Sequence, residues 1–126
     1  MSQSPVRIAV AGALGRMGKA VSATLEGRAD AVAAARFDRP GAEGEGLVAL
    51  ESALADVQAI IDFTIPEASV ALAETIAAAG GGIALIIGST GFTTEQDARL
   101  AKAAKAVTIV RSGNFSLGVN MLMGLV

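Results

Sequence analysis

The chain has 126 residues, of which 52% are hydrophobic and 17% charged, a size and composition typical of one globular domain. No apolar run is long enough to span a membrane, and a net charge of −2 with 3% aromatic residues excludes an extended nucleic-acid surface. The lack of cysteine excludes disulfides and thiolate metal sites and fits a cytoplasmic protein, and we expect no metal site.

Short apolar runs bounded by turn residues predict strands at residues 6–11, 31–37, 59–63, 83–87 and 107–110. Apolar spacing and end signals predict helices at residues 16–25 and 66–79 and from residue 93 or 94 to 105, with a short helical turn at 52–55. Strands that alternate with helices in this way are typical of a parallel sheet covered on both faces. We therefore predict an α/β fold, a Rossmann-type doubly wound parallel sheet, as a single domain over residues 1–126.

A G-x-x-G-x-x-G motif lies between the first strand and the first helix, at Gly12, Ala13, Leu14, Gly15, Arg16, Met17 and Gly18. Its first glycine permits a tight turn, a middle glycine lets the backbone approach a pyrophosphate, and the last permits close helix–strand packing. The helix N-terminus adds free N–H groups for an anion. The usual fingerprint is G-x-G-x-x-G, and here Leu14 occupies the second glycine position, so a turn without a ligand is the alternative.

Asp38 follows the motif by about 20 residues, at the end of the second predicted strand. An acidic side chain there accepts hydrogen bonds from an adenine ribose, whereas Arg39 beside it suits a 2′-phosphate. The pair indicates tolerance for both NADH and NADPH. The alternative is an ordinary solvated turn, because Pro40 and Gly41 come next.

Three further strand ends carry small, hydroxyl or amide residues beside a phenylalanine, at residues 62–64, 88–92 and 113–116. Parallel strands bring such ends to one edge of a sheet, where backbone groups, Phe63 and Thr90 would suit a nicotinamide ring and a substrate oxygen. Each end also has a plain structural explanation: Asp62 as a helix cap and the glycines and Asn114 as turn residues. The chain has no His, Cys or Tyr, so any proton transfer near neutral pH must come mainly from a cofactor or from residues outside it.

Four motifs in order resemble the dihydrodipicolinate reductase family: Gly-Ala-x-Gly-Arg-Met-Gly, Asp-Phe-Thr, Gly-Ser-Thr-Gly-Phe and Asn-Phe-Ser-x-Gly-Val-Asn. The resemblance covers nearly the whole chain. It implies a Rossmann domain that binds NADH or NADPH, and a separate carboxyl-terminal domain that binds a small dicarboxylate substrate and forms a homotetramer. It also implies hydride transfer to dehydrated hydroxytetrahydrodipicolinate, giving tetrahydrodipicolinate in lysine and diaminopimelate biosynthesis.

The resemblance also implies roles for individual residues. The pyrophosphate would lie on residues 12–17, and the adenosine ribose or its phosphate on Asp38 and Arg39. The nicotinamide side would take the residues of the later motifs, with Thr90 also near substrate: Phe63, Gly88, Ser89, Thr90, Ser112, Gly113, Asn114 and Phe115.

The chain departs from the family pattern in three places. The family often has Thr where this chain has Ser89, and this replacement keeps a hydroxyl. The family often has Ala-Pro where this chain has Ser112 and Gly113, and this replacement makes the backbone of this chain less constrained. The family's catalytic stretch of paired histidines, a lysine and a Pro-Ser-Gly-Thr segment is not found in these residues. We therefore expect an amino-terminal fragment, cut in the helix that leads to the second domain and inactive alone.

Two other functions remain open on the sequence. The chain is also compatible with the cofactor domain of a homoserine or aspartate dehydrogenase, which shares the fold and the first glycines but not the later motifs. A non-catalytic dinucleotide sensor would suit the missing proton donors, but would need only the adenosine half of the site.

Overall fold

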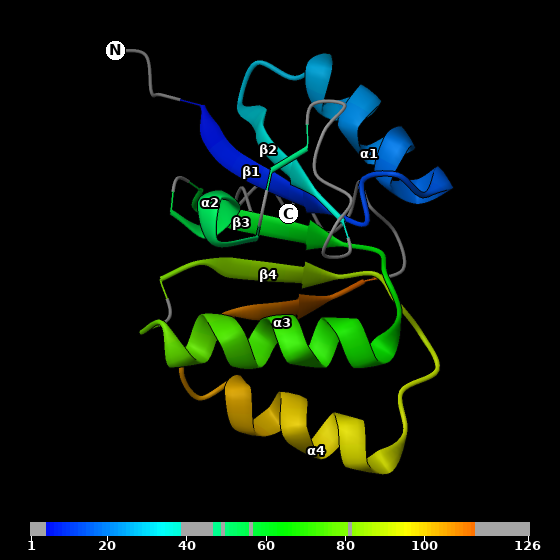
Figure 1. Cartoon of the computed structure of the whole chain (residues 1–126), viewed down its shortest axis with the longest axis vertical. Helices are drawn as coiled ribbons and strands as arrows, with labels where there is room; N and C mark the ends of the chain where they lie inside the picture. Colours follow the sequence, from blue (N-terminus) through cyan, green and yellow to red (C-terminus); the bar gives the residue numbers. More distant parts are fainter. Residues whose placement is uncertain (1–4, 39–46, 49, 56, 81, 113–126) are drawn as a thin grey trace. The chain divides into compact units, whose positions relative to one another are not determined.

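The structure, a computed structural model, describes residues 5–38, 47–48, 50–55, 57–80 and 82–112 (Figure 1). The chain divides into two compact units, Met1–Ile61 (unit 1) and Asp62–Val126 (unit 2), with the boundary inside the third strand.

Unit 1 is built around two parallel strands, β1 (Val6–Ala11) and β2 (Ala31–Phe37), which pair along their whole length. The register shifts once, so that Ile8 lies opposite Ala33 but Ala9 opposite Ala35. The third strand, β3 (Ala59–Asp62), is the other neighbour of β1 and is preceded by a short helix, α2 (Leu50–Leu54). Ahead of β3, the backbone N–H of Gln58 donates to the carbonyl oxygen of Arg7 at 2.8 Å.

The helix α1 (Arg16–Glu26) packs on β1 and β2 and buries a face of small and apolar residues: Gly18, Val21, Ser22 and Leu25. The apolar spacing in the sequence predicts a face of Met17, Ala20, Val21, Thr24 and Leu25. Val21 and Leu25 are buried as predicted, whereas Met17, Ala20 and Thr24 are exposed, so this part of the prediction is wrong. The buried stripe runs through Gly18 and Ser22, since small residues let the helix approach the strands most closely.

Unit 2 contains the end of β3 followed by α3 (Pro66–Ala78), β4 (Ala84–Ile87), α4 (Thr94–Ala103) and β5 (Ile109–Arg111). The strands β4 and β5 are parallel, and the helices α3 and α4 contact each other (Figure 1). Immediately after β4, the backbone N–H of Gly88 donates to the carbonyl oxygen of Asp62 at 2.8 Å.

The strands are hydrogen-bonded in the order β2-β1-β3-β4-β5, which confirms the predicted α/β fold with a parallel, doubly wound sheet. The order reverses between β1 and β3, the type of position at which such sheets bind ligands. The strand cores are apolar on both faces, with residues 8–11, 59–61 and 85–87 all buried, as expected for a covered parallel sheet.

Several predicted boundaries are wrong by two residues, at the start of α2 and between α4 and β5. The sequence predicts a helical turn at 52–55, a helix to residue 105 and a strand at 107–110, whereas α2 begins at Leu50, α4 ends at Ala103 and β5 runs from Ile109 to Arg111. Tight turns close the helix, with Lys105 N–H donating to Lys102 O and Val107 N–H to Ala103 O. Val107 is buried in this connection, so its apolar side chain indicated burial rather than a strand. In the described part of the chain, none of the helices has the length and apolar character needed to cross a membrane.

Candidate functional site

The first site element is the glycine turn, residues 12–15, which joins β1 to α1. Gly12 has φ of +70°, a left-handed conformation that glycine adopts readily and other residues rarely do. The turn is closed by a hydrogen bond from Gly15 N–H to Gly12 O at 3.0 Å. It is fixed to β2 by a bond from Ala13 N–H to Phe37 O at 3.1 Å.

Gly18 allows the first turn of α1 to press against the glycine turn. A Cβ atom on Gly18 would lie 2.1 Å from the carbonyl oxygen of Gly12 and 2.8 Å from the Cα of Ala13. These neighbours are backbone atoms, so a side chain at this position would have to displace the turn itself. The last glycine of the motif thus has the packing role that the sequence predicts.

Gly15 is the N-cap residue of α1. Among the described residues, a Cβ built there would have one neighbour within 4 Å, the carbonyl oxygen of Gly12 at 3.4 Å. In the same part of the chain, no side chain caps the first turn of α1, and this turn contains no acidic residue. In contrast, α4 has a complete capping box between Thr93 and Gln96. The N-terminus of α1 therefore offers N–H groups and a positive dipole end to an anion.

Asp38 is connected to the glycine turn although 24 residues separate it from its partner there. Its Oδ2 accepts a hydrogen bond from the backbone N–H of Leu14 at 2.9 Å. The end of β2 thus brings a carboxylate beside the turn, as the sequence predicts for a ribose-binding residue. The predicted phosphate-binding residue, Arg39, lies outside the described residues.

In unit 2, Asp62 shapes the connection from β3 to α3. Its side chain is fully buried, and Oδ1 accepts hydrogen bonds from the N–H and the hydroxyl of Thr64. The other oxygen, Oδ2, has no partner among the described residues. The alternative reading of Asp62 as a helix cap is wrong, because Ile65 occupies the N-cap position of α3 and Pro66 begins the helix.

Phe63 and Gly88, both predicted to face the nicotinamide, lie against each other. A Cβ atom on Gly88 would fall 2.0 Å from Cε1 of the Phe63 ring. The hydrogen bond from Gly88 to Asp62 holds the two segments at this distance. The ring therefore packs directly on the backbone at the end of β4.

Ser89 and Thr90 complete the segment after β4, which we call the 88–90 segment. Ser89 Oγ lies 2.8 Å from Oγ of Ser69 on α3, whereas the side chain of Thr90 is exposed. Ser112 N–H donates to Ile87 O at 2.9 Å, so the residue after β5 is held beside the start of this segment. Three further predicted residues, Gly113, Asn114 and Phe115, lie outside the described residues.

Ser69 is a residue that the sequence analysis missed. Its side chain is fully buried on the face of α3 that also buries Val70, Ala73 and Ile76. A serine on the apolar face of a predicted helix was the available signal, because a buried hydroxyl needs a hydrogen-bond partner.

The charged groups of unit 2 form a surface network between α3 and α4. Arg99 pairs with Glu74 at 2.6 Å and with Glu67 at 3.1 Å. The hydrogen bond from Arg99 lowers the pKa of Glu74, and hydrogen bonds from Gln96 and Arg99 lower the pKa of Glu67. Glu67 and Glu74 are exposed and Arg99 is partly exposed, and these side chains join two helices, so we assign them to stability.

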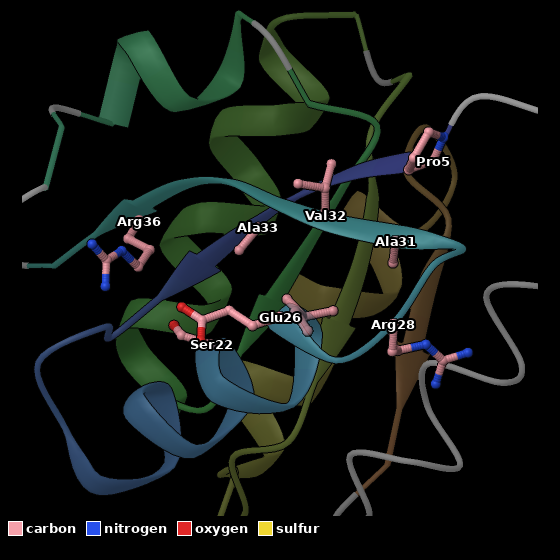
Figure 2. A pocket seen from close by; sticks show the side chains of 9 residues that line it. Pro5, Ser22, Glu26, Arg28, Ala31, Val32, Ala33 and Arg36 are labelled. Atoms are coloured by element: carbon pink, nitrogen blue, oxygen red, sulfur yellow. The ribbon is translucent and has the colours of Figure 1, made fainter.

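A depression of about 390 Å³ lies on unit 1 between α1 and β2 (Figure 2). Ser22 and Glu26 line it from α1, and Ala33 and Arg36 from β2. None of the predicted site residues lines it. We favour the glycine turn as the ligand site because its uncapped helix end offers N–H groups to an anion, whereas the depression contains none of the residues that the sequence assigns to a ligand. Among the described residues, no three His, Cys, Asp or Glu side chains are grouped to hold a metal ion.

Comparison with known proteins decides the family. Residues 6–115 match the model of the family described as dihydrodipicolinate reductase, N-terminus. The chain belongs to this family. The match favours this reductase family over the homoserine and aspartate dehydrogenases that share the first glycines.

Relatives of this reductase family extend beyond the chain. The 4-hydroxy-tetrahydrodipicolinate reductase of Caulobacter vibrioides is 71% identical over 126 residues, which are 100% of this chain and 48% of the relative. The enzyme of the same name from Roseobacter denitrificans is 38% identical over 138 residues, covering 97% of this chain and 50% of the relative. The chain thus spans about half the length of the curated relatives it matches.

A solved structure shows the same fold. The dipicolinate-bound dihydrodipicolinate reductase from Paenisporosarcina sp. TG-14 aligns with a TM-score of 0.71 at 20% identity, over 94% of this chain and 51% of that chain. At this identity the similarity shows that the chain has the same fold as that structure, and it does not assign site residues.

Proposed function

We propose that this chain is the NAD(P)H-binding domain of a 4-hydroxy-tetrahydrodipicolinate reductase. The observation that carries the proposal is the uncapped N-terminus of α1, directly after the glycine turn and beside the carboxylate of Asp38. This is the arrangement by which doubly wound folds hold the pyrophosphate and adenosine ribose of a dinucleotide. Family membership and the names of the relatives support the same cofactor class.

The residues of unit 1 fit the adenosine half of the cofactor. Among the described residues, only the carbonyl oxygen of Gly12 lies within 4 Å of a Cβ on Gly15, which leaves room for a pyrophosphate at the N–H groups of α1, with residues 12–17 forming the cradle. Asp38 would accept hydrogen bonds from the ribose hydroxyls, and Arg39 would pair with the 2′-phosphate of NADPH. An acid and a base side by side support use of both NADH and NADPH.

The residues of unit 2 fit the nicotinamide half. The Phe63 ring and the 88–90 segment supply an apolar surface with polar backbone and hydroxyl groups, and Ser112 lies next to them. Gly113, Asn114 and Phe115 would close this side, and Thr90 would contact the substrate. The reduced nicotinamide, when bound, supplies the hydride.

We further propose a division of labour along the full-length protein. The chain contains no His, Cys or Tyr, which are the usual proton donors near neutral pH. A second domain, matching the remainder of the longer relatives, would bind the dicarboxylate substrate, donate the proton and form a homotetramer. The 126-residue chain alone would then bind cofactor without turning over substrate, and the whole enzyme would act in the cytoplasm.

Isothermal titration of the chain with NADH and then NADPH tests the proposal. Saturable one-to-one binding of both is expected, and a bulky residue at Gly15 should abolish it by filling the space in front of α1. Failure of the wild-type chain to bind either dinucleotide would contradict the proposed function. Binding of only one would assign Asp38 or Arg39 the dominant role.

A further inference from the structure

Ser69 is a polar side chain in an apolar layer, and its surroundings restrict its hydroxyl. The residue is 0% exposed, and its backbone N–H is already satisfied by the carbonyl oxygen of Ile65 at 2.9 Å. Its Oγ lies 2.8 Å from Oγ of Ser89. Among the described residues, no other hydrogen-bond partner of this hydroxyl is found.

The burial of Ser69 decides the direction of this hydrogen bond. If Ser89 donated, the proton of Ser69 would be buried without an acceptor in the described part of the chain, which is costly. If Ser69 donates, its proton is paired and the oxygen of Ser89 accepts. Ser89 is half-buried, so its own proton then points to a partner other than Ser69.

We propose that Ser69 orients Ser89 as a hydrogen-bond donor to the carboxamide oxygen of a bound nicotinamide. The inference deepens the proposed function and rests on it. Ser89 follows Gly88, and the Phe63 ring packs on the backbone of Gly88. The Ser89 hydroxyl therefore lies in the segment assigned to the nicotinamide half. A hydroxyl that accepts one hydrogen bond becomes a better donor for the next, because the two bonds polarise each other. Ser69 does not touch the cofactor and acts as a positioning residue.

The test compares Ser69→Ala with Thr75→Val in the 126-residue chain. Both changes remove a hydroxyl from α3, but Thr75 is exposed and donates to Ala71 O within its own helix. Titration calorimetry measures the affinity of each variant for NADH and for ADP-ribose, which lacks the nicotinamide. We expect Ser69→Ala to weaken NADH binding by roughly 3- to 10-fold and to leave ADP-ribose binding unchanged. Thr75→Val should change neither affinity.

A spectroscopic readout reports the nicotinamide directly. The reduced nicotinamide of NADH is itself fluorescent, so its emission follows the bound cofactor directly. In Ser69→Ala, the wavelength and intensity of this emission should move towards those of free NADH. Ser89→Ala should give a similar loss of affinity, and the double variant should lose little more, since both changes break one chain of hydrogen bonds.

The outcomes separate the two levels of the proposal. The role of Ser69 is overturned if the wild-type chain binds NADH and Ser69→Ala binds it equally well, or if Ser69→Ala loses the same affinity for NADH and for ADP-ribose. Either result is still compatible with the proposed cofactor domain. Additive losses in the double variant overturn the coupling between Ser69 and Ser89. Failure of the wild-type chain to bind either ligand overturns the proposed function, and the inference with it.

Discussion

The two units build their candidate ligand segments by different means. In unit 1 the close approach to the glycine turn is between backbone atoms, because Gly18 lies against the backbone of residues 12 and 13, and the Asp38 carboxylate adds one side-chain hydrogen bond. In unit 2 the backbone hydrogen bond of Gly88 is supplemented by side chains, with the Phe63 ring against Gly88 and Ser69 against Ser89. A segment made of backbone contacts tolerates few substitutions, because nothing flexible can give way. A segment positioned by side chains can change its position when those side chains are replaced.

Gly18→Ala should produce the largest loss of stability. The new Cβ would approach the carbonyl oxygen of Gly12 to 2.1 Å, and only movement of the backbone can relieve this contact. We expect a cost of about 3 kcal/mol or more, reduced somewhat by the better helix propensity of alanine. Urea unfolding followed by circular dichroism measures the difference. Gly27→Ala is the matched control, since the nearest described atom to its Cβ is Thr24 O at 3.6 Å. A Gly18→Ala protein as stable as this control would contradict the backbone argument.

Gly88→Ala should cost less, about 1 kcal/mol, because the atoms in its way belong to a half-buried ring that can rotate aside. Moving the ring should nevertheless weaken binding of NADH more than binding of ADP-ribose. Combining Gly88→Ala with Phe63→Leu should recover stability, since the smaller side chain makes room for the methyl group. Additive destabilisation in the double variant would show that the ring is not what restricts residue 88.

Asp38→Ala should affect both the ligand and the turn. Loss of the carboxylate leaves the Leu14 N–H without this acceptor, so we expect a decrease in unfolding free energy of about 1 kcal/mol. It should also weaken NADH binding by about 1.5 to 3 kcal/mol, the range for hydrogen bonds to a charged group. Asp38→Asn keeps an oxygen for Leu14, so its stability should stay near wild type while its affinity falls. Equal stability of the Ala and Asn variants would contradict a stabilising role for the hydrogen bond between Asp38 and the Leu14 N–H.

The smallest effect is expected at the surface of unit 2, where Arg99 joins α3 to α4. Its pairing lowers the pKa of Glu74 below the usual value of 4.5, so the folded state holds that proton less tightly than the unfolded state. The resulting stability is present above the unfolded pKa and is lost as the pH falls through the folded pKa. Arg99→Met should therefore lower Tm slightly at pH 7, with the difference from wild type disappearing in acid and shrinking in high salt. A difference that persists in acid would point to lost packing of the long side chain instead.

Several features of the candidate site could be read from the chain because they are local. Glycine is the residue that most readily adopts φ of +70° directly after a buried strand, so the glycine turn is visible as a motif. The sequence places Asp38 at the end of the second strand, and it places Phe63 and Gly88 at strand ends that share one edge of the sheet, whereas the contact between the Phe63 ring and Gly88 is a finding of the structure. The assignments of Arg39, Gly113, Asn114 and Phe115 remain predictions, since these residues lie outside the part of the chain that the structure describes.

The sequence by itself determined the alternation of strands and helices, because short apolar runs and helical end signals act over a few residues. Only the tertiary structure decided which face of α1 is buried, since small residues such as Gly18 and Ser22 carry little hydrophobic signal yet allow the closest approach. The same holds for the bonds from Leu14 to Asp38 and between Ser69 and Ser89, whose partners are 24 and 20 residues apart. Such contacts arise when packing brings distant segments together and leaves buried polar atoms that must find a partner, a condition that no local pattern expresses.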